Sequence, residues 1–371
     1  MLHSQTQLEQ IISERTALTP MEKFQMYAAS LALVLPWIAV EAHPPTQSPD
    51  ELTYRSAETL IYTGKYAEAE TFLREAIAGT TQSSEWLAAF WTLLSSAHYN
   101  QGHIADAEKC LDSSLSAAER VFGRDSIWAL SVKNSQSSFL IDTGRLAEAE
   151  AILRPAIAVG EKLYGADHAV VVGLMNRLGI VLQKSGNNAR AEPLFRRLLA
   201  VAGQANLDRR ISAELHHNLG ALYAEDGRLA MARRHIEEAL AIWREVVPAD
   251  NFSLVCGQNT LVYVLLREGH LREAHDLARK TSAAATSLFG ARQPLSLTAL
   301  RNFSYVLARM GRRSEALTIM EQAIPLYEET YGPESPILAE LLKAYASVLR
   351  KVGRRQDAKQ AEKRANAVIS R

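Results

Sequence analysis

The segment from Asn218 to Ile242 alternates between apolar and polar residues with the period of an α-helix. Small or apolar side chains recur three or four residues apart on either side of the sequence Glu225-Asp226-Gly227, at Leu219, Gly220, Tyr223, Ala232, Ile236 and Ala239. Such spacing places them on one face of a helix, and the polar break with its glycine is typical of a tight turn. The pattern predicts two amphipathic helices joined at Gly227, neither of which can bury its apolar face alone.

The same turn sequence recurs throughout the chain. Copies related to GRLAMAR begin at Gly64, Gly102, Gly144, Gly186, Gly227, Gly269, Gly311 and Gly353, with spacings of 38, 42, 42, 41, 42, 42 and 42 residues. A fixed period of this size over eight copies predicts an array of stacked repeats.

Two residue types recur in every copy. The glycine lets the chain leave the first helix of a repeat with a positive φ, which a Cβ would penalise. The alanine five residues later lets the second helix approach the first closely, whereas a larger side chain would overpack the contact. These alanines are Ala69, Ala107, Ala149, Ala191, Ala232, Ala274, Ala316 and Ala358. Four residues further on, a large apolar residue such as Phe195 is expected to fill the contact between neighbouring repeats.

With these columns the chain resembles the tetratricopeptide repeat family, and its 42-residue period is similar to that of the kinesin light chain type. A second glycine, preceded by an aromatic residue, follows 21 residues after the first and predicts long second helices that end at Gly123, Gly165, Gly290 and Gly332. The resemblance implies an all-α, right-handed superhelical solenoid of about eight helix-turn-helix repeats over residues 51–371. The last repeat is expected to act as a cap.

Composition and short motifs argue against an enzyme. The formal net charge is zero, so no global charge favours nucleic acid or a membrane surface. The sequence contains no phosphate-binding glycine loop, nucleophile elbow, HExxH motif or CxxC pair. His216 and His217 are adjacent and point in different directions on a helix. Because a site needs several convergent groups, we expect no catalytic residue, no cofactor and no metal site.

The first fifty residues do not follow the repeat. An uncharged run of 17 residues, 24–40, follows Lys23 and leads to the small residues around Ala42. This arrangement is typical of a secretory signal peptide that starts at Met21 and is cleaved after Ala42. We therefore predict a signal-peptide-like segment over 1–42, a linker over 43–50, and export to the periplasm or the medium. The alternatives are a helical cap on a cytoplasmic protein and a short membrane anchor, although a run broken by Pro36 forms no stable membrane span.

An asparagine series marks the first helices of five repeats. Its members are Asn134, Asn176, Asn218, Asn259 and Asn302, spaced by 42, 42, 41 and 43 residues. They avoid the packing face and are expected on the concave surface. Kinesin light chain repeats carry asparagines at similar positions facing a groove for extended peptides, so the resemblance implies such a groove here. An amide offers both a donor and an acceptor, which suits pairing with a peptide backbone. The alternative is that each asparagine ties its helix to the preceding linker.

Four more residues extend the predicted groove. Tyr263 and Tyr305 lie one turn from Asn259 and Asn302 and offer stacking surface. Arg301 and Lys343 occupy the equivalent position of the seventh and eighth repeats and favour acidic groups on the peptide.

Charge is unevenly distributed along the chain. Residues 50–120 carry 11 acidic and 5 basic side chains, whereas residues 350–371 carry 8 basic and 2 acidic ones. One interpretation is that these charges lie on solvent-facing helix surfaces and on a soluble last repeat. The alternative is weak head-to-tail self-association between the acidic first repeats and the basic last repeat. Nucleic acid is not expected as a partner, because no aromatic residues interleave with the terminal arginines.

Three classes of function fit these observations. The leading one is a non-enzymatic scaffold that binds a protein or peptide partner in a concave groove. A structural or assembly factor of a bacterial-type cell envelope is the alternative favoured by the signal-like segment and the charge asymmetry. A chaperone adaptor of the carboxylate-clamp kind ranks below both. Lys133 and Arg177 adjoin asparagines as that clamp requires, but the full Lys/Asn/Asn/Lys/Arg arrangement is absent.

Overall fold

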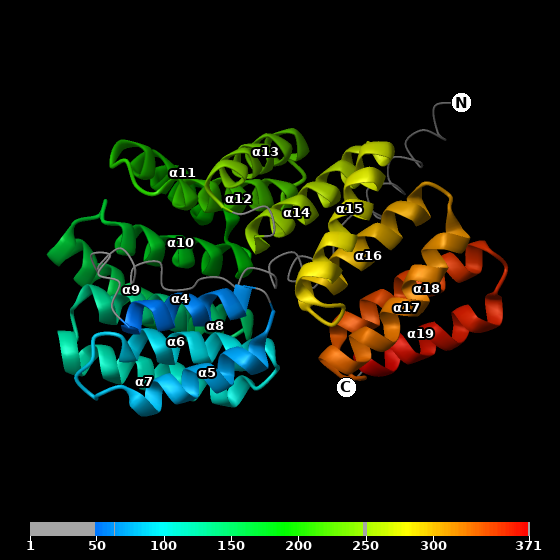
Figure 1. Ribbon diagram of the computed structural model, residues 1–371. Helices are drawn as coiled ribbons and strands as arrows, with labels where there is room; N and C mark the ends of the chain where they lie inside the picture. Colours follow the sequence, from blue (N-terminus) through cyan, green and yellow to red (C-terminus); the bar gives the residue numbers. More distant parts are fainter. Residues whose placement is uncertain (1–48, 63, 248–250, 370–371) are drawn as a thin grey trace.

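The chain is built from helices alone wherever the computed structural model describes it, at residues 49–62, 64–247 and 251–369. Sixteen helices and no strand occur in these ranges (Figure 1), which confirms the predicted all-α solenoid. The helices are α4 (Pro49–Tyr62), α5 (Tyr66–Gly79), α6 (Leu87–Asn100), α7 (Ile104–Phe122), α8 (Ile127–Asp142), α9 (Leu146–Tyr164), α10 (Ala169–Lys184), α11 (Asn188–Gln204), α12 (Arg209–Glu225), α13 (Leu229–Val246), α14 (Phe252–Glu268), α15 (Leu271–Phe289), α16 (Pro294–Arg309), α17 (Arg313–Tyr331), α18 (Pro336–Lys351) and α19 (Arg355–Ile369).

Consecutive helices form eight hairpins, each with an even-numbered first helix and an odd-numbered second helix. The predicted turn glycine joins the two helices in every hairpin, with φ between 74° and 84°. At Gly227, for example, φ is 75° and the Arg228 amide donates to the Tyr223 carbonyl at 2.8 Å. A side chain with a Cβ is strained in this left-handed conformation, so the repeated glycine follows directly from the turn.

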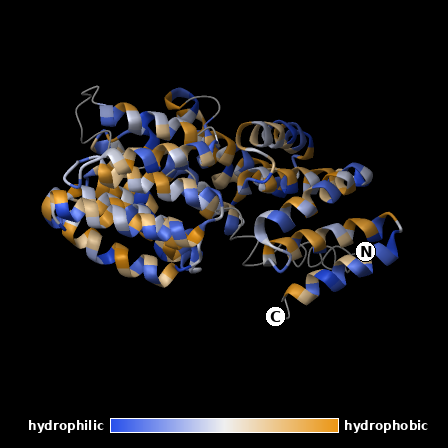
Figure 2. Cartoon of the chain, turned by 60° about the horizontal axis from the view of Figure 1, so that its bottom comes forward, coloured by the Kyte–Doolittle hydropathy of each residue, from blue (hydrophilic) through white to orange (hydrophobic). Residues whose placement is uncertain are grey.

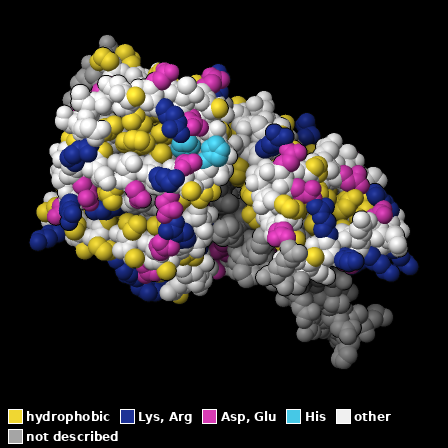
Figure 3. All heavy atoms as spheres, turned by 90° about the horizontal axis from the view of Figure 1, so that it is seen from below, with side chains coloured by type: hydrophobic (Ala, Val, Ile, Leu, Met, Phe, Trp, Pro, Cys, Tyr) yellow, Lys and Arg dark blue, Asp and Glu magenta, His cyan; other side chains and the backbone are white. Residues whose placement is uncertain are grey.

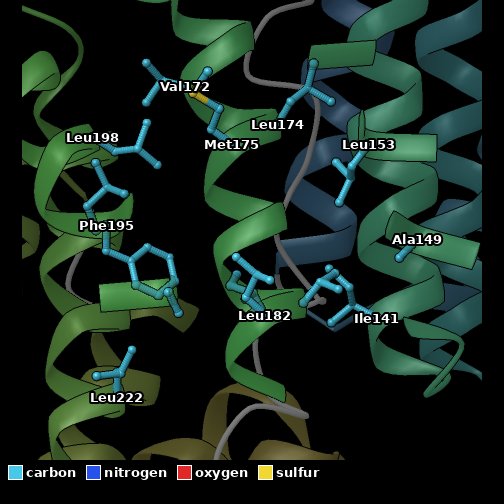
Figure 4. Close-up of a cluster of buried hydrophobic side chains, with 14 of the residues drawn as sticks. Ile141, Ala149, Leu153, Val172, Leu174, Met175, Leu182, Phe195, Leu198 and Leu222 are labelled. Carbon is cyan, nitrogen blue, oxygen red and sulfur yellow. The ribbon is translucent and has the colours of Figure 1, made fainter. Parts of the chain in front are cut away.

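Tight packing between the two helices of each hairpin explains the alanine column. All eight of the predicted alanines have 0% exposure, and so do the apolar residues Phe195 and Ile236 four positions later. Figure 4 shows side chains from α8, α9, α10 and α11 meeting in this core, with Phe195 reaching toward α10. The apolar faces of the helices are turned inward in this way along the array, while polar residues cover their outer faces (Figure 2).

Gly220 on α12 is expected to tolerate no side chain. A Cβ built there would lie 2.6 Å from Cδ1 of Ile236 and 3.1 Å from the carbonyl oxygen of Ala232 on the facing helix α13. The substitution Gly220→Ala should therefore lower the free energy of unfolding by about 1–3 kcal/mol through overpacking. Chemical denaturation measures this change.

The matched control is Gly203→Ala, the same substitution in α11 with no atom within 4 Å of the added Cβ. It should stabilise the protein by up to about 1 kcal/mol, because alanine has the higher helix propensity. Equal effects of the two substitutions would show that α12 and α13 do not pack as described.

The second helices end as predicted at Gly123, Gly165, Gly290 and Gly332, which have φ between 84° and 93°. In these repeats a short linker leads directly into the next first helix. The fourth repeat departs from this pattern, because α11 is followed by Ala205 and by Asn206 with a φ of 50°. Asparagine is one of the few residues other than glycine that adopts this conformation readily.

Curvature of the array brings the first helices to its inner side. Neighbouring first helices contact one another from α4 to α16, whereas no pair of second helices in the described ranges packs as closely. The array bends far enough for its beginning to meet its sixth repeat (Figure 1). At that point an ideal Cβ on Gly64 would lie 3.6 Å from the carbonyl oxygen of Phe289. The inner surface formed by the first helices is therefore the concave one.

The predicted segment 1–42 lies outside the described residues, so the predictions of a signal peptide and of export stay predictions. Helix α4 begins at Pro49, and the last two residues of the predicted linker 43–50 are therefore helical. Proline suits a first helical position, since its missing N–H has no intrahelical partner there in any case. No helix in the described ranges has the length and apolarity needed to cross a membrane.

Candidate functional site

The inner surface carries the asparagine series on helices α8, α10, α12, α14 and α16. The structure joins four of the five residues in two pairs. Asn218 Nδ2 donates to Asn176 Oδ1 at 2.8 Å, and Asn302 Nδ2 donates to Asn259 Oδ1 at 2.8 Å. These hydrogen bonds connect one first helix to the next and do not run to the preceding linkers. Asn176, Asn259 and Asn302 are buried between the first helices, and Asn218 is half-buried, so the series lies within the packing of the first helices and not away from it as predicted.

The uneven spacing of the series has a structural reason. Counted back from the turn glycine of its own repeat, Asn176 and Asn259 stand at position −10, whereas Asn218 and Asn302 stand at position −9. Position −10 of one first helix faces position −9 of the next. A series that looked like one column in the sequence is therefore two columns, and their members face each other across the interface.

His217 and Thr260 follow the same register between α12 and α14, where His217 Nε2 lies 3.1 Å from Thr260 Oγ1. His217 is 7% exposed. Burial lowers its pKa to about 4, and the hydrogen bond with Asn218 acts in the opposite direction. At the interface between α8 and α10 the corresponding residues are Asn134, at position −10 of α8, and Arg177, at position −9 of α10. The side-chain oxygen of Asn134 is buried without a hydrogen-bond partner among the described residues.

The other four predicted residues lie on α14, α16 and α18. The Tyr263 hydroxyl accepts from Arg267 Nη1 at 2.5 Å, and the ring is 9% exposed. The Arg301 guanidinium lies 5.9 Å from the ring centroid of half-buried Tyr305 and is itself largely buried. Lys343 is exposed and pairs with Glu340 at 2.9 Å. Lys343 is thus the most accessible of the four.

A second polar column, missed in the sequence, stands two residues before the turn glycines. Its central members are Asp142, Lys184 and Glu225 at the ends of α8, α10 and α12. Burial lowers the pKa of Lys184 to about 8, and the charges of Asp142 and Glu225 oppose this shift. Burial raises the pKa of Asp142, and Lys184 and Arg177 oppose that shift. The sequence signal that could have revealed this column is its constant position, two residues before each turn glycine.

In the last three repeats this second column becomes entirely basic, with Arg267, Arg309 and Lys351. Arg301 and Lys343 lie on the same three first helices. The second column therefore changes from mixed charge at α8–α12 to positive charge at α14–α18, although Glu340 on α18 pairs with Lys343.

Acidic and basic side chains are interspersed over the face of the molecule shown in Figure 3. Basic residues of the last repeat form ion pairs, Arg350 with Glu362 in the same repeat and Arg364 with Glu328 of the preceding repeat. Arg354 bonds Glu321 of the preceding repeat at 3.0 Å. Such pairs use part of the terminal positive charge on which the predicted head-to-tail association depends. That association stays a prediction.

Comparison with protein families gives a consistent assignment. A model described as "Tetratricopeptide repeat" matches residues 128–204, 211–287, 253–329 and 295–368, and a second model with the same description matches residues 92–127. No curated protein matches the chain.

Several solved structures share the fold. The apo form of the quorum sensor NprR from B. thuringiensis is 12% identical, with a TM-score of 0.60 over 86% of this chain and 87% of that one. A Rap protein in complex with competence and sporulation factor is 13% identical, with a TM-score of 0.58 over 86% of this chain and 97% of that one. Repeats of a putative kinesin light chain from Podosopora anserina are 19% identical, with a TM-score of 0.45 over 54% of this chain and 96% of that one.

Proposed function

Because the chain belongs to the tetratricopeptide repeat family, we propose that it is a non-enzymatic scaffold whose inner surface binds an extended segment of a partner protein. The observation that carries this proposal is the register of polar side chains along consecutive first helices. Polar residues meet at three successive interfaces, between α10 and α12, α12 and α14, and α14 and α16. A periodic row of donors and acceptors matches the periodic N–H and C=O groups of an extended peptide.

The charge of the inner surface favours a direction for the bound segment. Acidic groups of the partner would lie toward α14–α18, near Lys343 and the basic end of the second column. One hydrogen bond contributes on the order of 1 kcal/mol net, so several must act together for micromolar affinity.

The relatives of known structure support a peptide as the ligand in one respect only. The Rap protein was crystallised with competence and sporulation factor, and NprR is described as a quorum sensor. At 12–13% identity these likenesses show the shared fold. The partner of this chain is therefore proposed from its own inner surface.

Selection from a library of displayed random peptides, with the full chain as the target, tests the proposal. We expect enriched peptides with acidic residues clustered toward one end. The double substitution Asn218→Ala with Asn259→Ala removes one member of each asparagine pair and should abolish capture of those peptides. Asn187→Ala, in the turn after α10 and without a side-chain capping bond, is the matched control and should leave capture unchanged.

Thermal melting of the same variants separates binding from folding. Lost capture with an unchanged melting temperature supports the groove. A lowered melting temperature with full capture means that the asparagines serve only to join neighbouring helices, and it contradicts the proposal.

A further inference from the structure

A Glu–Arg ion pair recurs between neighbouring repeats. It joins the residue six positions after one turn glycine to the residue directly after the next turn glycine. Arg145 bonds Glu108 at 2.6 Å in this way, and Arg228 bonds Glu192 at 2.6 Å. Between the first and second repeats the same two positions hold Glu70 and His103. Four of the seven interfaces have arginine directly after the turn glycine, whereas this one has a histidine.

A second histidine replaces a core leucine at the same interface. Four residues before the turn glycine, six of the eight repeats carry leucine, at Leu60, Leu140, Leu182, Leu265, Leu307 and Leu349. The fifth repeat has Tyr223, whose hydroxyl donates to Glu192 at 2.9 Å. The second repeat has His98, which is 3% exposed and whose Nδ1 is buried without a hydrogen-bond partner among the residues that the structure describes. A buried polar atom without a partner destabilises a protein, so its presence calls for a ligand.

These substituted residues converge on one point. Glu70 on α5, His98 on α6 and His103 at the start of α7 each offer one ligand atom, and the three atoms lie within 4.8 Å of one another. His98 Nδ1 is 3.8 Å from Glu70 Oε2. The His103 amide donates to the His98 carbonyl at 2.9 Å, which fixes the turn that carries both imidazoles. Within the described residues no other group of three such side chains converges in this way.

We propose that Glu70, His98 and His103 bind a divalent transition metal ion, with Zn²⁺ as the best match, and that the ion fastens the first repeat to the second. Two imidazoles and one carboxylate form a ligand set typical of Zn²⁺, with water in the fourth position. The ion would supply the positive charge that Arg145 and Arg228 provide at the two interfaces with the Glu–Arg pair. This proposal departs from the sequence-based expectation of no metal site, which considered histidines close in sequence and not those brought together by the repeat.

The geometry needs only a small adjustment. Zn²⁺ holds nitrogen and oxygen ligands at about 2.0–2.2 Å, which places tetrahedral ligand atoms about 3.4 Å apart, so the most distant pair must close by up to about 1.5 Å. His103 is exposed and its ring can rotate toward the other two ligands. Gln101 Nε2 already donates to Glu70 Oε2 at 2.9 Å and orients the carboxylate, as outer partners of metal ligands commonly do.

Arg74 is the one group that opposes the ion. Its Nε donates to Glu70 Oε1 at 3.0 Å, and its Nη2 lies 3.3 Å from His98 Nε2. When Nδ1 holds the metal, neutral His98 carries its proton on Nε2, so the guanidinium must turn away. The Arg74 side chain is 59% exposed and has solvent into which it can turn.

Calorimetric titration of the metal-free full chain with Zn²⁺ tests the site. We expect one high-affinity ion per chain and a rise in melting temperature with Zn²⁺ concentration. His98→Leu restores the residue of the other repeats, and His103→Arg restores the ion pair with Glu70. Both variants should fold, and each should weaken Zn²⁺ binding by about 100-fold or more, since the loss of an outer partner alone can reach that size. Arg74→Gln should strengthen binding several-fold.

The control is His270→Arg, the same substitution directly after the turn glycine of the sixth repeat. It should leave the Zn²⁺ affinity unchanged. Co²⁺ should give the visible absorption of tetrahedral coordination in the wild type and lose it in His98→Leu. Wild-type affinity in both His98→Leu and His103→Arg, or no stoichiometric Zn²⁺ in the wild type, overturns the proposal.

Discussion

Replacing Phe195 with alanine is expected to lower the free energy of unfolding by about 3–5 kcal/mol. The Phe195 ring has 0% exposure and lies against Gly179, where an added Cβ would be 2.5 Å from the ring. Gly179 has no side chain that can move into the space, so the substitution leaves a cavity between α10 and α11. Denaturation with urea, followed by the helical circular dichroism signal, measures the loss.

A truncation on the outer surface provides the comparison. Leu163 on α9 is 52% exposed, and Leu163→Ala should change stability by about 0.5 kcal/mol or less. If Phe195→Ala were as mild as Leu163→Ala, the packing assigned to α10 and α11 would be wrong.

Stability should also fall as the pH is lowered from 7 to 4, with His217 as a main cause. Its pKa is about 4 in the folded protein and about 6.5 in an unfolded chain. Between these values the unfolded state binds a proton that the folded state does not, so the stabilisation is complete above pH 6.5 and is lost as the pH falls toward 4. The loss reaches about 3 kcal/mol, since one pKa unit corresponds to about 1.4 kcal/mol.

Unfolding free energies across this pH range in the wild type and in His217→Gln test the assignment. Glutamine keeps an amide that can bond Thr260, but it does not titrate, so the variant should show a shallower dependence. His98, His216 and His235, whose pKa values are also lowered by burial, contribute to the slope that remains. His270→Gln, which alters an exposed ring, should keep the wild-type profile. Identical profiles for His217→Gln and the wild type would contradict the role of His217.

The fold could be predicted from the sequence because its constraints are local. A turn that needs positive φ selects glycine, and a close helix contact selects alanine, so both appear as columns with a fixed period. The asparagine positions were found by the same means. Their pairing was not, because it depends on how far one helix is offset from the next. The spacings of 41 and 43 residues were its only trace.

The proposed metal ligands show a second limit of sequence reasoning. His98 and His103 are informative only as departures from the leucine that six repeats, and the arginine that four repeats, place at those positions. Glu70 becomes their neighbour only when two repeats are stacked. A search for ligands at short spacing within one helix cannot find such a site, whereas a comparison of equivalent positions between repeats can.

The contact between Gly64 and Phe289 changes the mechanical character of the molecule. A chain of repeats that touch only their neighbours behaves as an open spring, whose bending is shared among all its joints. Here the first and sixth repeats also approach each other, with Gly64 beside Phe289. A motion that opens the array would therefore have to separate these two repeats as well as bend the joints between neighbours.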